Sequence, residues 1–400
     1  MMRHFRRAAT LCICLLVLCS CAFAENTVSF SGPGYDALQY ACTLPDGRMI
    51  FTGYRSVEGN YQESRARLLC LNPDKTVSWE YFDPSEGKCG YGAALVREDG
   101  RLAVIFSNSP YQTLTERKIK YFTVEGEPLE NTVDIFRKES LLNAFCPSFM
   151  QITVIPGDAE VFWRYFLDWD GNELFKISSE EMITIEGAFE AEDGVVLMGC
   201  EPVWPSNAKI MKLDLKGNVL WETVLPTHLE HLPDARLEYC RQTSDGGYLA
   251  LYWETSGSMS DGETPDRYQA LVKFNQDGRL LWMNHDCFPQ GEFKQCKGLH
   301  EYNGKYVMEL NTIQKSFSIS NPRLFLWFDE DGQALGQTEL MIKKEDLNIQ
   351  ADQEKIENVG GNFVTMSDGL WMLRDIVIEN DNHMKEMDSR DVFLFKIPEL

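Results

Sequence analysis

Short apolar runs separated by tight polar turns recur along the whole chain. The clearest copies are residues 209–221 (KIMKLDLKGNVLW) and 270–282 (ALVKFNQDGRLLW), where an apolar run leads into an Asp/Gly turn and a second run ends at Trp. Weaker copies occupy residues 67–79, 118–130, 162–175 and 323–336. A phrase repeated at a nearly fixed period predicts a repeat architecture.

A second signal precedes each phrase: a turn pair followed by a short apolar run, such as YLALYW at residues 248–253. Asp-Gly and Asn-Gly pairs supply the positive φ angles that two-residue hairpin turns require. The flanking runs are rich in branched and aromatic residues, which favours strands. The predicted turns are Asp46-Gly47, Asp99-Gly100, Asp193-Gly194, Asp245-Gly246-Gly247, Asn303-Gly304 and Gly360-Gly361.

Each unit is therefore predicted to contain four antiparallel strands, A to D, with tight A–B and C–D turns and longer B–C and D–A loops. Four-stranded units repeated around a ring form an all-β fold, the β-propeller. The second-turn residues of the six complete phrases are Lys75, Gly126, Gly171, Gly217, Gly278 and Gly332. Their spacing of 45 to 61 residues is close to that of one blade. With the last, partial unit the sequence predicts seven blades. Six or eight remain open, because Pro156-Gly157-Asp158 shortens the third unit.

The two ends of the chain fit together in this scheme. Residues 392–400 (VFLFKIPEL) align with ALVKFNQDG, so the seventh unit stops after its strand C. Residues 27–32 (TVSFSG) form a spare strand near the start. We expect this strand to complete the seventh blade, closing the ring and removing an open sheet edge. Residues 25–400 would then form a single propeller domain.

Trp79, Trp221 and Trp282 each lie four residues after the turn residue of their phrase. This repeat resembles those of PQQ-like and WD40-like β-propellers of exported bacterial proteins. The resemblance implies a ring that binds a ligand or a partner, and no cofactor site is carried over from it. Recurrence of an aromatic residue in one slot, with Phe175 in the third copy, predicts packing between blades. The slot holds Glu130 and Gly336 in two other copies.

The first 24 residues have the features of a signal peptide. Arg3, Arg6 and Arg7 precede an apolar run of 11 residues, 8–18, which is too short to span a bilayer. Ala22-Phe23-Ala24 predicts cleavage before Glu25 and release as a soluble protein. Residues 18–21 (LCSC) instead resemble a lipobox that would end the signal before Cys21 and lipidate that residue. We favour release, because Cys19 is unusual in its slot. Both routes place the protein outside the cytoplasm, and only lipidation of Cys21 would attach it to a membrane.

Charge restricts the partners of the protein. The chain has 38 Lys+Arg and 61 Asp+Glu, a formal net charge of −23. Nucleic-acid binding requires a basic surface, so this balance excludes a nucleic-acid partner. The acidic residues are spread along the chain, which is typical of a soluble surface. We expect a monomer.

Eight cysteines follow the leader: Cys42, Cys70, Cys89, Cys146, Cys200, Cys240, Cys287 and Cys296. An even number in an exported chain permits disulfides, and Cys287 and Cys296 form the best local pair. Most of the others lie in apolar strand-like runs, where Cys behaves as a small hydrophobic residue. No C-x-x-C motif occurs, so a zinc ribbon or a thioredoxin-type site is not expected.

Three polar segments could suggest chemistry. His228 and His231 have the spacing of two metal ligands, the acidic segment 256–267 could attract calcium, and His285-Asp286-Cys287 could suggest a nucleophile. None has the further ligands or the geometry that such sites need. Each is interpreted as a surface loop, and the sequence predicts no metal, no cofactor and no catalytic residue.

Function is therefore expected on the variable B–C loops, because loops on a rigid scaffold usually carry binding. Aromatic and basic residues in these loops are the candidate ligand-binding or partner-binding residues: Tyr54, Arg55, Tyr61, Arg65, Tyr111, Trp204, Trp253, Arg267, Lys315 and Phe317. The favoured hypothesis is a non-catalytic exported propeller that binds a protein or glycan. The alternatives are a carbohydrate hydrolase or lyase that uses the central pocket, and a lipid-anchored envelope scaffold.

Overall fold

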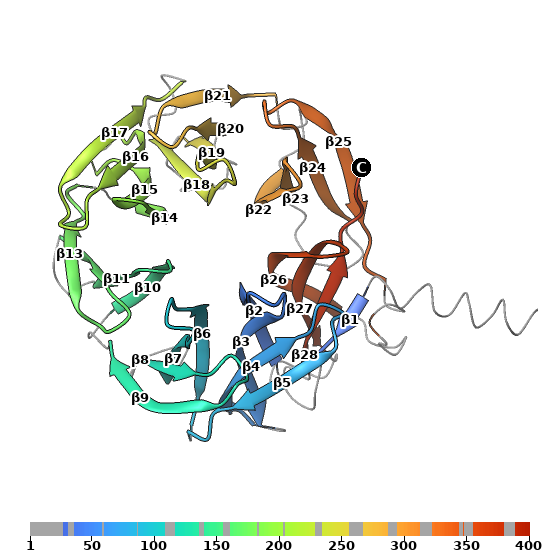
Figure 1. Ribbon diagram of the computed structural model, residues 1–400. Coiled ribbons are helices and arrows are strands. Elements are labelled where there is room, and N and C mark those ends of the chain that lie inside the picture. Colours follow the sequence, from blue (N-terminus) through green and yellow to red (C-terminus); the bar gives the residue numbers. More distant parts are fainter. Residues whose placement is uncertain are drawn as a thin grey trace, which may run out of the picture.

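Seven four-stranded antiparallel sheets form a closed ring in the computed structural model (Figure 1). This confirms the predicted seven-blade β-propeller. The structure describes residues 27–30, 36–57, 60–85, 87–108, 117–135, 140–154, 161–181, 184–202, 205–228, 234–255, 267–286, 294–312, 322–343, 347, 355–379 and 389–400. Within these ranges no helix is long and apolar enough to cross a membrane.

The blades are numbered in chain order, and each runs from an innermost strand A to an outermost strand D. Blade 1 has β2 (Asp36–Thr43), β3 (Met49–Val57), β4 (Asn60–Leu71) and β5 (Val77–Phe82). Blade 2 has β6 (Cys89–Val96), β7 (Leu102–Asn108), β8 (Arg117–Phe122) and β9 (Pro128–Asp134). Blade 3 has β10 (Ser140–Phe145), β11 (Met150–Val154), β12 (Trp163–Leu167) and β13 (Glu173–Ser178).

Blade 4 has β14 (Thr184–Ala191), β15 (Gly194–Cys200), β16 (Ala208–Leu213) and β17 (Val219–Leu225). Blade 5 has β18 (Asp234–Gln242), β19 (Tyr248–Thr255), β20 (Arg267–Phe274) and β21 (Leu280–Asn284). Blade 6 has β22 (Lys294–Tyr302), β23 (Lys305–Thr312), β24 (Arg323–Phe328) and β25 (Ala334–Leu340). Blade 7 has β26 (Lys355–Met366), β27 (Gly369–Glu379), β28 (Ser389–Lys396) and, as its outermost strand, β1 (Thr27–Ser29).

The core lies between neighbouring blades, so the middle strands bury both of their faces. All seven residues of β15 (GVVLMGC) are buried. One apolar cluster joins Val196 and Ile210 of blade 4 to Ala250 and Val272 of blade 5. Burial on both faces explains why these strands are continuous apolar runs instead of alternating ones.

The repeated Trp packs against the turn of the next blade, as predicted. Trp79 donates its indole N–H to the carbonyl of Val124 (3.1 Å), and its ring covers Gly126. Trp221 covers Gly278, where a Cβ would lie only 2.1 Å from the ring. The turn glycines have φ between 72° and 86° in blades 2 to 6, so their backbone also favours Gly.

The seam between blades 7 and 1 uses a different residue in this turn. Lys75 occupies the glycine position with φ of 69°. Its Nζ pairs with Asp368 at 2.5 Å and lies 4.2 Å from the centroid of the Trp371 ring. The preceding outer strand, β1, has only three residues and supplies no Trp. A lysine therefore fits where a bulky indole covers the turn in blades 2, 5 and 6.

The N-terminal strand closes the ring, as the sequence predicts. β1 pairs antiparallel with β28, with Val28 opposite Leu394. The amide of Phe30 donates to the carbonyl of Val392 at 2.9 Å. The Phe30 side chain is buried in an apolar cluster that also contains Phe51 of blade 1 and Trp371 of blade 7. The first and last parts of the chain thus share one sheet and one core.

Two of the predicted turns are wrong. Gly360 and Gly361 lie inside β26, where the register shifts between Val359 and Asn362. The hairpin turn instead precedes Gly369, because Met366 pairs with that residue. A Gly pair is also typical of a bulge in a strand, so composition alone did not distinguish the two cases.

The other misplaced turn is Asp193-Gly194. Gly194 is the first residue of β15 and pairs with Ala191, so the turn consists of Glu192 and Asp193. A Cβ at Gly194 would lie 1.9 Å from the carbonyl oxygen of Leu213. Glycine is needed here for the close approach of another strand.

Blade 3 has all four strands, although the sequence left few residues for the loop between its predicted strands B and C. Its first hairpin is closed by the Cys146 amide, which donates to the carbonyl of Phe149 at 2.8 Å. β11 and β12 have five residues each. Shorter strands therefore compensate for the short third unit.

A buried lysine secures one turn of blade 5. Lys273 is 1% exposed, and its Nζ lies 2.7 Å from Oδ1 of Asp245 and also donates to the Thr243 hydroxyl. Burial raises the pKa of Asp245, but hydrogen bonds from Lys273, Thr243 and the Gly247 amide outweigh it and lower the pKa from 3.8 to about 2. The folded state therefore favours the charged carboxylate.

We expect this pair to make stability depend on pH in the acid range. A depressed folded-state pKa contributes stability above pH 3.8, and that stability is lost as pH falls toward 2. Asp245→Asn should lower the free energy of unfolding by about 1 kcal/mol at pH 7, since the carboxylate is partly exposed. Urea unfolding from pH 7 to pH 2 should show the difference between Asp245→Asn and wild type shrink as the pH approaches 2. Asp277→Asn, in the next turn of the blade, is the control. A difference that is constant with pH would contradict the assignment.

Candidate functional site

The predicted binding residues of blade 1 lie close together at the ends of β3 and β4. Tyr54 is buried, with 8% of its surface exposed, and leaves little area for a ligand. Arg55 is opposite Arg65 across the two strands. Arg65 is exposed, so it is the member of this group that a partner could reach.

Arg55 is held by its own blade. Its Nε donates to Oδ1 of the buried Asp36 at 2.7 Å, and its guanidinium lies 5.0 Å from the centroid of Phe82. The Nε of Arg67 donates to Oε1 of Glu80, on the outermost strand of the same blade, at 2.6 Å. These contacts fix the end of blade 1, and a binding role for Arg55 stays a prediction.

Trp253 lies far from that group, in β19 of blade 5 on another part of the ring (Figure 1). Its ring is 4.0 Å from the guanidinium carbon of Arg236, which lies opposite it on β18. The candidates whose side chains the structure describes therefore lie at two separate places on the ring. Tyr111, Trp204, Lys315, Phe317 and Cys21 lie outside the described residues, as do the side chains of Tyr61 and Arg267.

The structure brings together two histidines that the sequence placed in separate motifs. The rings of His228 and His285 have centroids 5.3 Å apart, and Tyr268 lies 4.9 Å from His228 and 5.2 Å from His285. Burial and the neighbouring His228 lower the pKa of His285. No group of three or more metal-ligating side chains occurs among the described residues. His231, Cys287 and most of the acidic segment 256–267 lie outside them.

The described cysteines behave as core residues. Cys70, Cys146 and Cys240 are buried. Burial raises the pKa of Cys70 to about 11 and that of Cys146 to about 12, so these thiols are protonated at neutral pH. The pairing of Cys296 with Cys287 stays a prediction, because Cys287 lies outside the described residues.

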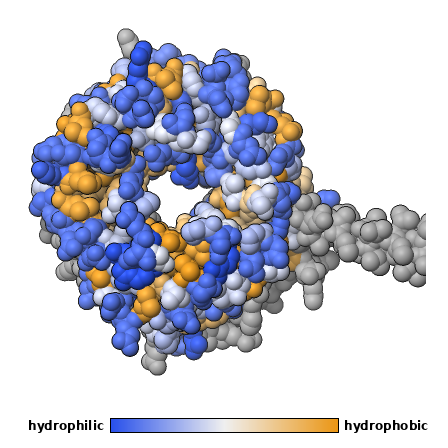
Figure 2. Space-filling model, viewed as in Figure 1, coloured by the Kyte–Doolittle hydropathy of each residue, from blue (hydrophilic) through white to orange (hydrophobic). Residues whose placement is uncertain are grey.

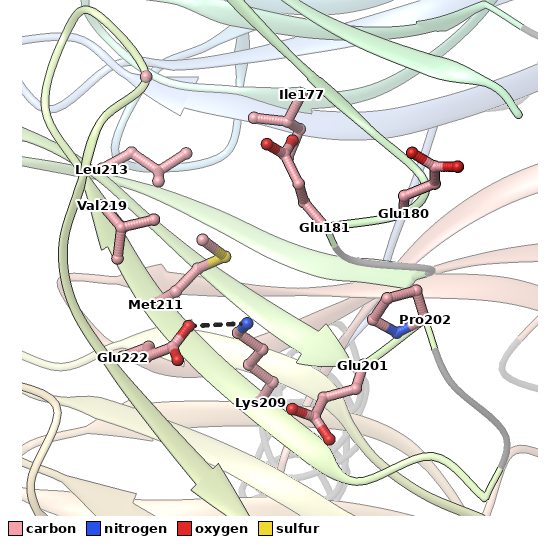
Figure 3. Close-up of a pocket in the computed structure, with 11 residues that line it drawn as sticks. Ile177, Glu180, Glu181, Glu201, Pro202, Lys209, Met211, Leu213, Val219 and Glu222 are labelled. Atoms are coloured by element: carbon pink, nitrogen blue, oxygen red, sulfur yellow. Dashed lines mark ion pairs between the residues drawn. The ribbon is translucent and has the colours of Figure 1, made fainter.

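A pocket of about 380 Å³ lies between the outer parts of blades 3 and 4 (Figure 3). Glu180 and Glu181 reach it from the D–A connection of blade 3, and Glu201 from the B–C loop of blade 4. Both segments are on the face that carries the long loops. Its volume is within the range of about 300–1,000 Å³ that is usual for small-ligand sites.

The structure of the repeat explains why a pocket forms here. In the third copy Phe175 replaces Trp, and its ring lies against the turn glycine Gly217 of blade 4. A Cβ built on Gly217 would lie 3.1 Å from the Phe175 ring. Phe175 also stacks on Phe166, with ring centroids 4.3 Å apart. A smaller ring that is drawn toward its own blade leaves space beside β16 and β17.

The wall of the pocket is apolar and its rim is acidic. Ile177, Met211, Leu213 and Val219 supply the apolar wall. Figure 3 shows Glu180 and Glu181 on the side opposite Lys209, Glu201 and Glu222. Four glutamates and one lysine give the lining a formal charge of −3.

Hydrogen bonds hold three of the four carboxylates in place. The Ser178 amide donates to Glu181 at 2.9 Å, and the side-chain amide of Asn207 donates to Glu201 at 2.7 Å. The buried Lys209 pairs with Glu222 at 2.8 Å. A cationic ligand would therefore meet carboxylates whose positions are already fixed, which lowers the entropy cost of binding.

No sequence motif marks these five polar residues, because acidic residues occur throughout the chain. Two signals could have indicated them. One is the exchange of Trp for Phe175 in a repeat slot, and the other is the Glu180-Glu181 pair directly after the same phrase.

No protein-family model and no curated protein matches the chain. Among solved structures, the β-propeller domain of the Trilobed protease from Pyrococcus furiosus aligns with a TM-score of 0.49 and 9% identity, over 88% of this chain and 98% of that chain. Prolyl oligopeptidase B from Galerina marginata aligns with a TM-score of 0.45 and 9% identity, over 86% of this chain and 47% of that chain. A chain from a study of two prolyl endopeptidases aligns with a TM-score of 0.40 and 12% identity, over 90% of this chain and 56% of that chain. This chain thus spans about half the length of the last two, and these similarities carry no information on activity.

Proposed function

We propose that the protein is an exported, non-catalytic β-propeller that binds a protein partner through its loop face. The pocket between blades 3 and 4 would receive a basic side chain of that partner. One observation carries this proposal: a pocket with apolar lining residues has Glu180, Glu181 and Glu201 where it meets the loop segments and Glu222 on β17. The predicted B–C loop residues would surround it as a wider contact surface.

A lysine or arginine side chain suits this lining better than a neutral ligand does. Its aliphatic stem can lie along Met211 and Leu213 while its charged end contacts carboxylates at the rim. Arg can bind a carboxylate through two parallel hydrogen bonds. A glycan without a cationic group would leave the acidic rim uncompensated, so we favour a protein over a glycan.

The charge of the whole chain supports the same partner. A net charge of −23 attracts basic proteins over long distances and raises their rate of association. The pocket would then provide the specific contact, because long-range attraction alone does not select a position on the ring.

We expect binding of a labelled octa-arginine peptide to depend on the pocket. Glu180→Gln together with Glu181→Gln should weaken binding about tenfold in fluorescence anisotropy, because two rim charges are lost while the Ser178 hydrogen bond is kept. Glu127→Gln with Glu130→Gln removes the same charge from exposed positions of blade 2 and should change the affinity less than about twofold.

Equal weakening by both double variants would mean that the peptide senses only net charge, and the proposed pocket contact would be rejected. Retained affinity in both variants would reject it as well. Circular dichroism of both proteins checks that the ring is intact.

Export, the monomeric state and the relationship to PQQ-like or WD40-like propellers are parts of the same proposal. They are supported by the leader, the acidic surface and the repeat phrase, respectively. The intact mass of the protein from its host distinguishes release at Glu25 from an acylated Cys21, which would favour the envelope-scaffold alternative.

A further inference from the structure

The outermost strand of every blade pairs with one neighbour within the described part of the chain. Its other edge presents backbone N–H and C=O groups to which a further strand can bind. Proteins commonly protect such edges by keeping the strand short or by placing Lys or Pro in it, and Gly weakens a strand as well. The seven outermost strands therefore differ in how readily they accept an extended partner.

Most of the outermost strands are protected in one of these ways. β1 has three residues and β21 has five. β9 begins with Pro128, β13 contains Lys176 and β25 contains Gly336. β17 (VLWETVL) and β5 (VSWEYF) contain no Pro, Lys or Gly, and β17 is the longer, with seven residues against six. Among the described outermost strands, β17 thus has the longest unprotected edge.

The surface of β17 is apolar where it begins. Val219 is 53% exposed and Leu220 is 47% exposed, and Leu215 in the preceding turn is 50% exposed. Figure 2 shows apolar residues on the outer side of the ring at the upper left, where Figure 1 places β17. Exposed apolar residues that lie together are typical of an interaction site, whereas isolated ones are common on any surface.

The two faces of β17 have different neighbours. Trp221 covers Gly278 of blade 5, whereas Val219 and Glu222 line the pocket between blades 3 and 4 (Figure 3). Val224 lies two residues after Glu222, so it shares the face of β17 that holds the pocket. A strand that adds to β17 therefore meets one carboxylate between two valines on this face.

The carboxylate of Glu222 can accept a second cation. Lys209 contacts its Oε2 at 2.8 Å, and the Glu222 side chain remains 50% exposed. With Lys209 included, the lining of the pocket keeps a formal charge of −3. Opposite charges that face each other across two strands stabilise their pairing. A basic residue opposite Glu222 on an added strand is therefore favoured.

Charge also decides which chain can occupy this edge. Two copies of this chain would each carry a net charge of −23, and pairing β17 with itself would place one acidic lining beside another. Like charges opposite one another destabilise a sheet. The same carboxylates attract a basic segment. The occupant that fits is thus an extended segment of another protein with at least one basic residue.

We propose that the edge of β17 binds such a segment as a fifth strand of blade 4. The inference rests on the proposed function and deepens it, because the basic side chain enters the pocket from a strand that is paired with β17. The segment carries apolar residues two places before and two places after the basic residue, since these three side chains share a face. Backbone hydrogen bonds supply affinity, and the side chains on one face supply specificity.

The probe is a labelled peptide, Ser-Val-Thr-Arg-Thr-Val-Ser, which has the same sequence in both directions and so fits either strand direction. Its arginine and both valines share one face. The isomer Ser-Thr-Val-Arg-Val-Thr-Ser has the same composition, but its valines lie on the face opposite the arginine. Fluorescence anisotropy with the mature chain should show at least fivefold weaker binding of the isomer. Equal binding of the two peptides would overturn the predicted face pattern.

Methylation of backbone nitrogens tests the strand pairing itself. In a strand, the N–H groups of successive residues point to opposite edges, so the valine and threonine amides of the probe lie on different edges. One peptide is methylated at both valines and the other at both threonines. One of them should bind about tenfold more weakly, because hydrogen bonds to β17 are lost, and the other should bind within about threefold of the probe.

Equal affinities of the two methylated peptides would overturn the added strand. If octa-arginine binding still depended on Glu180 and Glu181 in that case, the pocket contact of the proposed function would stand without it. Loss of that dependence would reject the proposed function as well. The two failures are thus distinguishable.

A matched pair of variants locates the edge on the ring. Val219→Lys places a protecting lysine at the start of β17 and should weaken binding of the probe at least tenfold. Val77 has the same place in β5 and is 55% exposed, so Val77→Lys adds the same charge to the other long edge and should change the affinity less than twofold. Equal effects of the two variants would overturn the assignment to β17.

Sedimentation of the mature chain tests the other occupant. The chain should remain monomeric as its concentration rises. A dimer that Val219→Lys dissociates and Val77→Lys does not would assign the edge to a second copy of the chain and overturn the proposal.

Discussion

Gly278→Ala is expected to destabilise the protein by about 2–5 kcal/mol. The turn holds this residue at φ of 72°, which costs a residue with a Cβ about 1–2 kcal/mol. The new methyl group would also lie 2.1 Å from the Trp221 ring, and forcing a group into a filled contact adds about 1–3 kcal/mol. Chemical unfolding followed by tryptophan fluorescence measures the change.

Gly100→Ala is the matched control for that change. Gly100 has φ of 78° and nothing within 4 Å of a Cβ built on it. Gly100→Ala should lower the free energy of unfolding only by the cost of the positive φ angle, about 1 kcal/mol. In a Trp221→Ala background, Gly278→Ala should fall to the same cost. Equal effects of the two substitutions in the wild-type background would show that the indole does not restrict the turn.

Removal of β1 is expected to have the second large effect. A chain that begins at residue 32 would lose the pairing of β1 with β28 and the buried Phe30 side chain. Loss of a buried Phe alone costs about 3–5 kcal/mol. The backbone edge of β28 would also be left without its partner, and such edges promote association between chains. We expect a lower unfolding temperature and concentration-dependent oligomers in analytical ultracentrifugation.

A chain that begins at Glu25 is the control and should remain monomeric. A synthetic peptide of residues 25–33, added to the shortened chain, should restore stability by supplying the missing strand. If the shortened chain unfolds as the control does, the closure by β1 contributes little to the ring.

The turns and the closure of the ring could be predicted because their causes are local. A glycine such as Gly126 or Gly171 adopts a positive φ whatever surrounds it, and these residues mark the ends of strand pairs. A chain that ends after strand C leaves one outer position for the spare N-terminal strand. The errors arose where glycine has two uses: Gly361 lies in a bulge, and Gly194 allows a close approach of strands.

The candidate sites could not be predicted in the same way. Glu181 and Glu222 are 41 residues apart in the sequence and meet only because blades 3 and 4 are neighbours. His228 follows β17 of blade 4 and His285 follows β21 of blade 5, so they too come from distant segments. No local pattern encodes such a meeting, since it depends on the packing of whole sheets.

The sequence by itself therefore determined the β-propeller class, most of the hairpin turns, the packing of Trp79, Trp221 and Trp282 between blades, and the way the ring closes, while it left the number of blades between six and eight. Backbone preferences and the burial of apolar runs act within a few residues, so they can be read along the chain. Only the tertiary structure decided the pocket at Lys209 and the contact between His228 and His285. These depend on how neighbouring sheets twist and fit together, which places residues from distant segments against one another.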